Sequence, residues 1–329
     1  MAIGKSSDFK IYEEQFQSGY IETDQQNVDA LTGGSNGAIT IKGDQLKGNY
    51  SQAAFFQTIA TSTLIIRRDL TAVTAATDLA VAQGEMASVK CFRTIGPIAQ
   101  TVGSWKHAGM DPQEISVVFG EQTAKAVLTE KLNSALAGSV AALYHQGSNV
   151  TVDATNQSTT TLTHGYLANA LAKFGDQANR IVAWVMHSKP YYDLVGQSIT
   201  DKITNVADVV IHTGIPAALG RPVIVTDSAA LINTVATPDM YVTMGLSQDA
   251  IQITDSEVPQ IEGQMVTGLL QLVYRLQGEY AYNLALKGFT WDISNGAANP
   301  TAAALASSTN WDPVAASVKD MLGVRIITT

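Results

Sequence analysis

Cysteine is almost missing from the sequence, because Cys91 is the single one among 329 residues. One cysteine excludes an internal disulfide and a zinc site built from cysteines, and it suits a reducing compartment. Residues 87–95 alternate between apolar and polar side chains, which predicts a strand. We therefore expect Cys91 to be a small buried side chain on that strand and not a reactive thiol.

Long apolar runs are absent as well. No stretch approaches the ~20 consecutive apolar residues that a membrane-spanning helix needs. The first residues, MAIGKSSDFKIYEEQF, lack the apolar core of a signal peptide. We therefore expect a soluble protein without a membrane partner, made and assembled in a cytoplasm.

Basic charge is scarce. The chain has 20 lysines and arginines against 29 aspartates and glutamates, a formal net charge of -9. The longest basic cluster is Arg67 and Arg68, and Asp69 follows it directly. A protein that clamps nucleic acid usually carries a basic excess or stripe, so this pattern argues against one. Only 15% of the residues are charged and 46% are apolar, which predicts a large core and a surface partly covered by other molecules.

Motifs for catalysis and metal binding are also missing. The sequence has no GxSxG or HExxH motif and no GxxxxGK followed by Ser or Thr, and its five histidines have no zinc spacing. The glycine-rich segment 33–43 lacks a phosphate-loop lysine, so we interpret it as a flexible arm. Asp255, Glu257 and Glu262 lie among Pro and Gly, which favours a solvated loop. We predict no catalytic residue, no metal and no cofactor.

The segment IVAWVMHSKPYYDLVGQ places His, Ser and Asp beside an apolar run, 181–186, that predicts a buried strand. Ser188 suits a helix N-cap, Pro190 the first helical turn, and Asp193 the positive end of the helix dipole. As a hydrolase site, the same segment would use Ser188 as nucleophile, His187 as base and Asp193 as the orienting acid. Neighbours in sequence rarely form one line of hydrogen bonds, so we favour the structural interpretation.

The first third of the chain has little material for a core. Residues 1–44 are polar and rich in Gly, Asn, Asp and Gln, so we expect an arm that lies on another surface or stays mobile. Residues 45–105 predict a long two-stranded excursion, in which the strand at 87–95 pairs with an earlier one near 61–66.

The rest of the chain has stronger patterns. Asp111 and Pro112 begin a helix that we expect to run to Tyr144, about 51 Å at 1.5 Å per residue. A polar loop at 145–163 follows it, and then α/β patterns begin. The predicted elements are helices at 164–174 and 189–202, strands at 181–186, 209–212, 222–226, 241–246 and 250–253, a long strand at 269–286 with a bulge at Gly278, an anchoring Trp291, and a last strand at 324–327.

In this order the elements resemble the major capsid proteins of tailed bacteriophages, whose fold is shared with encapsulins and the herpesvirus capsid floor. Four local motifs add to the resemblance: WVMHSKPYYDLV, GRPVIVTDSAAL (220–231), YVTMGLSQDAIQI (241–253) and LKGFTWDI (286–293). The resemblance spans nearly the whole chain and implies an α+β phage-capsid fold. It divides the chain into an N-terminal arm (1–44), an extended loop (45–105), a first peripheral part (106–163) with a spine helix (111–144), an axial domain (164–265), and a peripheral return strand with the C-terminal tail (266–329).

The resemblance also implies a function. Copies of the chain would self-assemble as pentamers and hexamers of an icosahedral shell around phage double-stranded DNA, without sequence-specific binding. The implied partners are other copies, the portal protein, and scaffolding or decoration proteins. The virion capsid would be its location, after assembly in the bacterial cytoplasm.

Some members of this family join a lysine of the extended loop to an asparagine of another subunit. The expected tip here is Arg67, Arg68 and Asp69, and Lys90 lies away from it on the return strand. We therefore predict non-covalent contacts only. Arg67 and Arg68 would contact acidic residues of a neighbouring subunit, with Glu114 or Glu121 on its spine helix as candidates.

Three alternatives remain. An encapsulin-like compartment would have the same fold and a protein cargo, although the long polar arm favours a phage capsid. A tail-tube or decoration protein rarely combines a spine helix with an α/β insertion. A hydrolase built on 164–265 would depend on Ser188.

Overall fold

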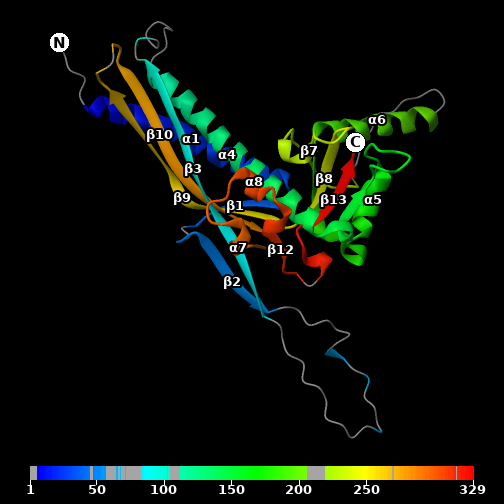
Figure 1. Ribbon diagram of the computed structural model, residues 1–329. Helices are drawn as coiled ribbons and strands as arrows, with labels where there is room; N and C mark the ends of the chain where they lie inside the picture. Colours follow the sequence, from blue (N-terminus) through cyan, green and yellow to red (C-terminus); the bar gives the residue numbers. More distant parts are fainter. Residues whose placement is uncertain are drawn as a thin grey trace.

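Two large β-sheets connected by one long helix form most of the molecule, and two short strands make a third, small sheet (Figure 1). The computed structural model describes residues 6–44, 47–56, 64, 65, 67, 71, 83–101, 103, 112–205, 219–268, 270–315 and 317–329. Helix α4, Pro112–His145, contacts strands of both sheets, and it begins and ends within one residue of the predicted 111–144 helix. In the part of the chain that is described, no helix is both long enough and apolar enough to span a membrane.

The first sheet has five strands in the order β1-β9-β10-β3-β2. They are β1 (Ile39–Gly43), β9 (Ile251–Val266), β10 (Val273–Leu286), β3 (Gln83–Thr101) and β2 (Tyr50–Phe56). All neighbouring pairs are antiparallel except β1 with β9. Strand β10 confirms the predicted long strand, and its pairing with β3 shifts between Leu276 and Gly278, which confirms the predicted bulge. A side chain at Gly278 would come within 2.7 Å of Ile261, which explains the glycine.

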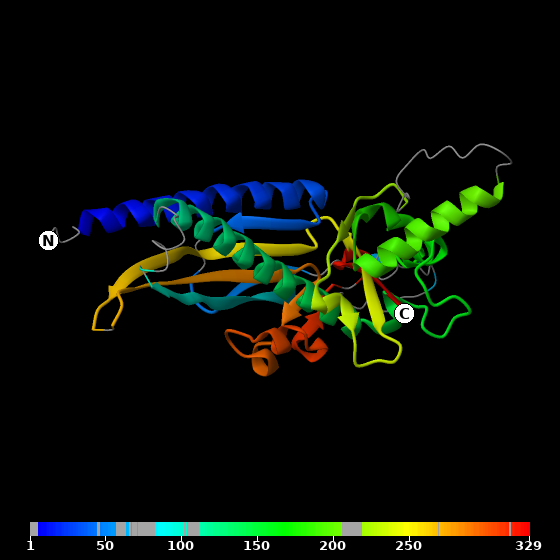
Figure 2. The same ribbon diagram turned by 90° about the horizontal axis from the view of Figure 1, so that it is seen from above.

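Helix α1, Ser6–Gly34, lies beside α4 over one side of this sheet (Figure 2). Phe16 and Tyr20 are four residues apart, so they share one helix face, and both are buried. The two backbones come close at Gly120 of α4, where an added Cβ would lie 2.4 Å from the carbonyl oxygen of Phe16. A larger residue at this position would force the two helices apart.

The predicted flexible arm at 33–43 is therefore wrong. Residues 6–34 are helical, and Asn36 and Gly37 form a turn with positive φ that leads into β1. Strand β1 pairs with β9 in the register Ile39 with Ile251, and Ile39 is buried. Among the α1 side chains that the structure describes, most are exposed or half-buried, so the polar composition of this segment concealed the helix. The role of residues 1–44 as an intersubunit arm stays a prediction.

The strand prediction at 87–95 is confirmed by β3, which is longer at both ends. Cys91 is fully buried on it, as expected, and burial raises the pKa of its thiol to about 11. In the described part of the chain, the earlier strand that pairs with β3 on this side is β2, at 50–56 and not at the predicted 61–66. Residues 61–63 and 66 lie outside the described part of the chain, and Leu64 and Ile65 are not in a strand.

The second sheet has the order β4-β13-β8-β5-β6, with β7 beside β8. Its strands are β4 (Thr151–Asp153), β13 (Gly323–Thr328), β8 (Met240–Ser247), β5 (Ile181–Met186), β6 (Val223–Val225) and β7 (Ile232–Asn233), with helices α5 (His164–Ala172) and α6 (Ser188–Asn205) beside them. These elements confirm six of the predicted helices and strands, whereas the strand predicted at 209–212 lies outside the described residues. Trp184, Phe174 and Leu167 are fully buried between the sheet and the helices.

The strand predicted at 250–253 is only the beginning of β9, which is 16 residues long and belongs to the first sheet. The solvated loop predicted around Asp255, Glu257 and Glu262 is wrong, because all three lie on β9. Pro259 falls where the pairing with β10 is interrupted, so its missing N–H removes no ladder hydrogen bond. The axial segment predicted at 164–265 thus contributes strands to both sheets, and its boundaries stay a prediction.

The C-terminal region packs against α4 and β3. It contains strands β11 (Phe289–Trp291) and β12 (Trp311–Pro313), the short helices α7 (Ile293–Gly296) and α8 (Ala302–Leu305), and single 3-10 turns such as η4 (Ser308–Asn310). Trp291 and Trp311 are buried and meet edge to face with ring centroids 4.9 Å apart. The predicted anchoring role of Trp291 is confirmed.

Candidate assembly interface

The residues predicted to contact neighbouring subunits lie on different elements. Arg67 is exposed, and Arg68 and Asp69 lie outside the described residues. Glu114 and Glu121 both lie on α4, where the side chain of Glu121 is half-buried and that of Glu114 is outside the described part. The pairing of these residues between copies stays a prediction.

The junction between β5 and α6 has a different cap from the predicted one. His187 occupies the N-cap position, because its carbonyl oxygen accepts a hydrogen bond from the Tyr191 N–H at 3.3 Å. Its ring Nδ1 accepts from the Lys189 N–H, also at 3.3 Å. The Ser188 N–H instead donates to Asp227 at 3.3 Å, and this contact with Ser188 lowers the pKa of the Asp227 carboxyl. The prediction of a Ser188 cap is therefore wrong.

The structure does not assemble the three residues of the hydrolase alternative. Asp193 forms an ion pair with Lys189 at 2.8 Å, one helical turn away, and does not orient His187. Asp227 lies nearer to that ring, but 3.5 Å separates it from Nε2, and 3.4 Å separates the Ser188 hydroxyl from Nδ1. Both distances exceed the roughly 2.6–3.2 Å of a working nucleophile–base contact.

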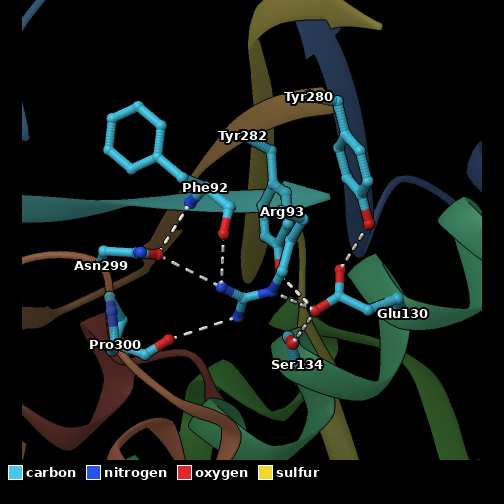
Figure 3. Close-up of polar contacts among 8 residues, drawn as sticks. All are labelled: Phe92, Arg93, Glu130, Ser134, Tyr280, Tyr282, Asn299 and Pro300. Atoms are coloured by element: carbon cyan, nitrogen blue, oxygen red, sulfur yellow. Dashed lines mark hydrogen bonds and ion pairs between the residues drawn. The ribbon is translucent and has the colours of Figure 1, made fainter. Parts of the chain in front are cut away.

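A cluster of polar side chains joins α4 to the first sheet, and we call it the polar junction (Figure 3). Its centre is Glu130 of α4, whose carboxylate accepts hydrogen bonds from Arg93 of β3 at 2.8 Å and from Tyr280 and Tyr282 of β10, each at 3.1 Å. Ser134, one turn further along α4, donates to the same carboxylate at 2.9 Å. One side chain thus holds three elements together.

Arg93 extends the polar junction towards the C-terminal region. Its guanidinium donates to the carbonyl oxygens of Phe92 at 3.0 Å and Pro300 at 3.3 Å, and Asn299 accepts from the Phe92 N–H (Figure 3). Burial is the largest single effect on the pKa of Arg93 and lowers it, but the hydrogen bond to Glu130 and the nearby charges of Glu130, Tyr282 and Cys91 together raise it more, so the net shift is upward. The arginine therefore stays charged and fixes the loop before α8 to the sheet.

The two tyrosines of the polar junction act as hydrogen-bond donors. Burial is the main reason why the pKa values of Tyr280 and Tyr282 lie far above their usual range, and the charge of Glu130 adds to it. Their rings stack at 6.2 Å. Sequence reasoning missed this cluster, although Tyr280 and Tyr282 are two residues apart on a predicted strand and so were bound to share a face.

Two further ion pairs connect β9 with its neighbours. Lys131 of α4 is only 2% exposed and contacts Asp255 at 2.7 Å, and Lys90 of β3 contacts Glu257 at 2.6 Å. Removing one partner of a buried pair is strongly destabilising, so the Lys131–Asp255 contact helps to fix α4 against β9, whereas the Glu257 side chain is 50% exposed and its pair with Lys90 contributes less. Lys90 is thus engaged within its own chain, and the prediction of no covalent crosslink stays untested.

Comparison with known proteins identifies the fold. The solved structure of the cyanophage Pam1 capsid asymmetric unit is similar with a TM-score of 0.51 and 12% identity over 88% of each chain. That of Mycobacterium phage Adephagia has a TM-score of 0.51 and 11% identity over 88% of this chain and 87% of that one. At such low identity these likenesses show the fold alone. No curated protein matches the sequence.

The assignment to a family depends on the sequence as a whole. The family model described as major capsid protein 13-like matches residues 8–325, from the early part of α1 into β13. The match includes both sheets and the long helix, and the α+β fold agrees with it. The chain therefore belongs to the major capsid protein 13-like family and is a structural protein of the tailed-phage virion.

Proposed function

We propose that copies of this chain assemble as pentamers and hexamers of an icosahedral shell that encloses phage double-stranded DNA, held by non-covalent contacts. Membership of the family supports this role. The extended loop (45–105) and the N-terminal arm (1–44) would then contact neighbouring subunits. The axial segment would surround the capsomer axis, and the α4 layer would form the peripheral wall.

The observation that carries the proposal is the pair of strands that leaves the body of the molecule. Strand β2 and the first part of β3 project beyond the other elements of the first sheet (Figure 1). A two-stranded ribbon is at best marginally stable alone in water. Leu64 and Ile65, which lie between these strands in sequence, are 60% and 73% exposed. Docking on a second copy would supply the burial that the isolated chain lacks.

The charge of the chain supports a container for DNA. A net charge of -9 gives the wall no general attraction for phosphate groups, so packed DNA would not adhere to it. Membership of the capsid family is also the reason for proposing the portal protein and scaffolding or decoration proteins as partners. Assembly would take place in the host cytoplasm.

Electron microscopy of the purified protein tests the proposal. We expect shells or capsomers from the full chain, and no assemblies from a variant in which residues 57–82 are replaced by a short turn. Circular dichroism checks that the shortened variant keeps its secondary structure. A full chain that stays monomeric under all assembly conditions, or a shortened variant that assembles equally well, would contradict the proposal.

The content of particles from infected cells separates the phage capsid from the encapsulin-like alternative. Packaged DNA and a portal vertex support the capsid, and a bound enzyme supports the compartment. The family match already favours the capsid.

A further inference from the structure

A cavity of about 630 Å³ lies between α1, the end of β1 and the middle of β9, and we call it the acidic pocket. Tyr20 and Asp24 reach it from successive turns of α1. Asp44 follows β1, and its backbone N–H donates to the carbonyl oxygen of Asp255 on β9 at 3.1 Å. Three carboxylates from three separate elements thus border one space.

Buried polar atoms without hydrogen bonds gather at this pocket. The Tyr20 hydroxyl, one carboxylate oxygen of Asp24 and the Ser256 hydroxyl are all buried and unpartnered, three of the seven such atoms in the described part of the chain. Tyr20 is only 6% exposed and Ser256 only 4%. Buried polar groups are nearly always hydrogen-bonded in folded proteins, so this concentration points to a ligand that supplies donors.

The charge in the acidic pocket is also unbalanced. Lys131 contacts Asp255 at 2.7 Å, but among the described residues neither Asp24 nor Asp44 takes part in an ion pair. Three carboxylates against one ammonium leave two negative charges. Burial raises the pKa of Asp24; Lys131 opposes this shift and Asp255 adds to it. A cation bound here would compensate the burial of that carboxylate.

A basic side chain fits the acidic pocket better than a metal ion. Within the described ranges, no three His, Cys, Asp or Glu side chains converge as metal ligands, and the Lys131 ammonium already occupies Asp255. A guanidinium carries five N–H donors in a planar fork, so it can serve several acceptors that lie apart. Ile21, 54% exposed at the edge of the pocket, offers an apolar surface for the methylene groups of such a side chain.

The position of the basic residues indicates which one can come from a second copy. In the described part of the chain, the exposed lysine and arginine side chains that make no hydrogen bond or ion pair are those of Lys42, Lys47, Arg67, Lys125 and Arg275. Four of them lie on or beside strands and helices of the body. In sequence, Arg67 lies between β2 and β3, and the ends of these strands that face it project from the body of the molecule (Figure 1).

We propose that the acidic pocket is the receptor for Arg67 of a second copy, with Leu64 and Ile65 of that copy packing beside Ile21. The proposal rests on the proposed self-assembly and names a different acceptor from Glu114 or Glu121. In this contact Asp24 and Asp44 take the guanidinium, and the Tyr20 and Ser256 hydroxyls complete its hydrogen bonds.

A charge exchange tests the contact. We expect Arg67→Glu and Asp44→Lys each to raise the protein concentration needed for assembly by about tenfold or more, because close charge pairs at interfaces are strongly coupled. The double variant should assemble nearly as the wild type does. Arg275→Glu and Asp239→Lys are the matched controls, since both positions are exposed and lie outside the acidic pocket. Single variants that assemble normally, or a double variant that is no better than the singles, would overturn the proposal.

Crosslinking between two chains tests the geometry. Arg67→Cys and Asp44→Cys chains are mixed before assembly and treated with a short bismaleimide, because an arginine–aspartate contact holds the Cα atoms farther apart than the about 7 Å that a disulfide spans. Buried Cys91, with its raised pKa, should give little background. We expect mixed dimers to exceed clearly those from Arg67→Cys mixed with Asp239→Cys. Equal yields would contradict the contact.

Three outcomes separate the failure of this inference from that of the proposed function. If the wild-type chain forms no particles, the proposed function fails. If it forms particles that depend on neither Arg67 nor Asp44, only the receptor is wrong. If a chelator dissociates the wild-type particles and calcium or magnesium restores them while Arg67→Gln assembles normally, the pocket binds a metal ion and the proposal is overturned.

Discussion

Glu130 offers the sharpest test of how the body of the subunit is held together. Glu130→Ala removes one carboxylate that accepts hydrogen bonds from Arg93, Ser134, Tyr280 and Tyr282. Arg93 keeps its bonds to two backbone carbonyls, so its charge is not left bare. The two tyrosine hydroxyls lose the acceptor that the structure gives them. The variant therefore tests whether one side chain couples α4 to the sheet.

The expected loss follows from these contacts. A hydrogen bond to a charged group contributes roughly 1.5–3 kcal/mol, and the lower end applies because the Glu130 side chain is 34% exposed. Each tyrosine bond adds about 1 kcal/mol, and the Ser134 hydroxyl can turn to another acceptor. We therefore expect Glu130→Ala to lower the free energy of unfolding by about 3 kcal/mol.

Urea unfolding measures this loss through tryptophan fluorescence, because Trp184, Trp291 and Trp311 are buried and change environment on unfolding. All variants are compared at one protein concentration below that needed for assembly, since assembly adds stability. Glu121→Ala is the matched control, an acidic residue on the same helix outside the polar junction. A loss below about 1 kcal/mol, or one no larger than that of Glu121→Ala, would refute the reasoning.

Three further predictions follow from the described residues. Gly120→Ala should lower the free energy of unfolding by about 1–3 kcal/mol, because the added methyl group would clash with the Phe16 carbonyl oxygen. Gly33→Ala is the control in the same urea assay, since a Cβ at residue 33 has no atom within 4 Å. Cys91 should stay unlabelled by iodoacetamide in the folded protein at mildly alkaline pH and react fully in urea, because burial raises its pKa to about 11; labelling of the folded protein would contradict this. The folded state raises the pKa of Asp24 and so holds its proton more tightly than the unfolded chain does. The isolated subunit should therefore lose stability relative to Asp24→Asn as the pH rises from the unfolded pKa of Asp24 through its raised folded pKa. Parallel pH profiles of stability for the two proteins would contradict this prediction.

Elements with strong local signals could be predicted from the sequence. The strand β5 stands out because its run of apolar residues ends abruptly at His187, and α4 because Pro112 opens a long apolar stripe. The bulge in β10 could be placed because a glycine interrupts an alternating pattern at 278. In each case the information lies within a few residues of the element itself.

Elements that depend on distant partners could not be predicted. Most of the described side chains of helix α1 are exposed or half-buried, and the residue that admits it, Gly120, lies about a hundred positions after Tyr20. Strand β9 carries Asp255 and Glu257, which suggested a solvated loop. Both are paired with lysines of β3 and α4 that are far away in sequence.

The sequence alone could predict only one side of the proposed contact between copies. The exposure of Arg67 could be inferred from its place on the expected loop, because that loop has little apolar material in which a basic side chain could be buried. The acceptor that we propose could not be inferred, because the acidic pocket brings together residues 20, 24, 44 and 255 from elements that are far apart in sequence. The earlier candidates, Glu114 and Glu121 on the spine helix, stay an untested prediction.

The isolated subunit leaves two features incomplete, and one contact between copies would complete both. Strand β2 and the first part of β3 project from the body, and the acidic pocket holds buried polar atoms without hydrogen-bond partners. Selection for the stability of the single chain alone would remove both features, because simple changes such as Asp24→Asn or a shorter ribbon would relieve their cost. They are instead consistent with selection on the assembled wall, where the ribbon of one copy would bring both apolar side chains and a cation to the next. The single subunit would then be less stable alone than it is in the shell, where a neighbour fills the pocket and covers the ribbon.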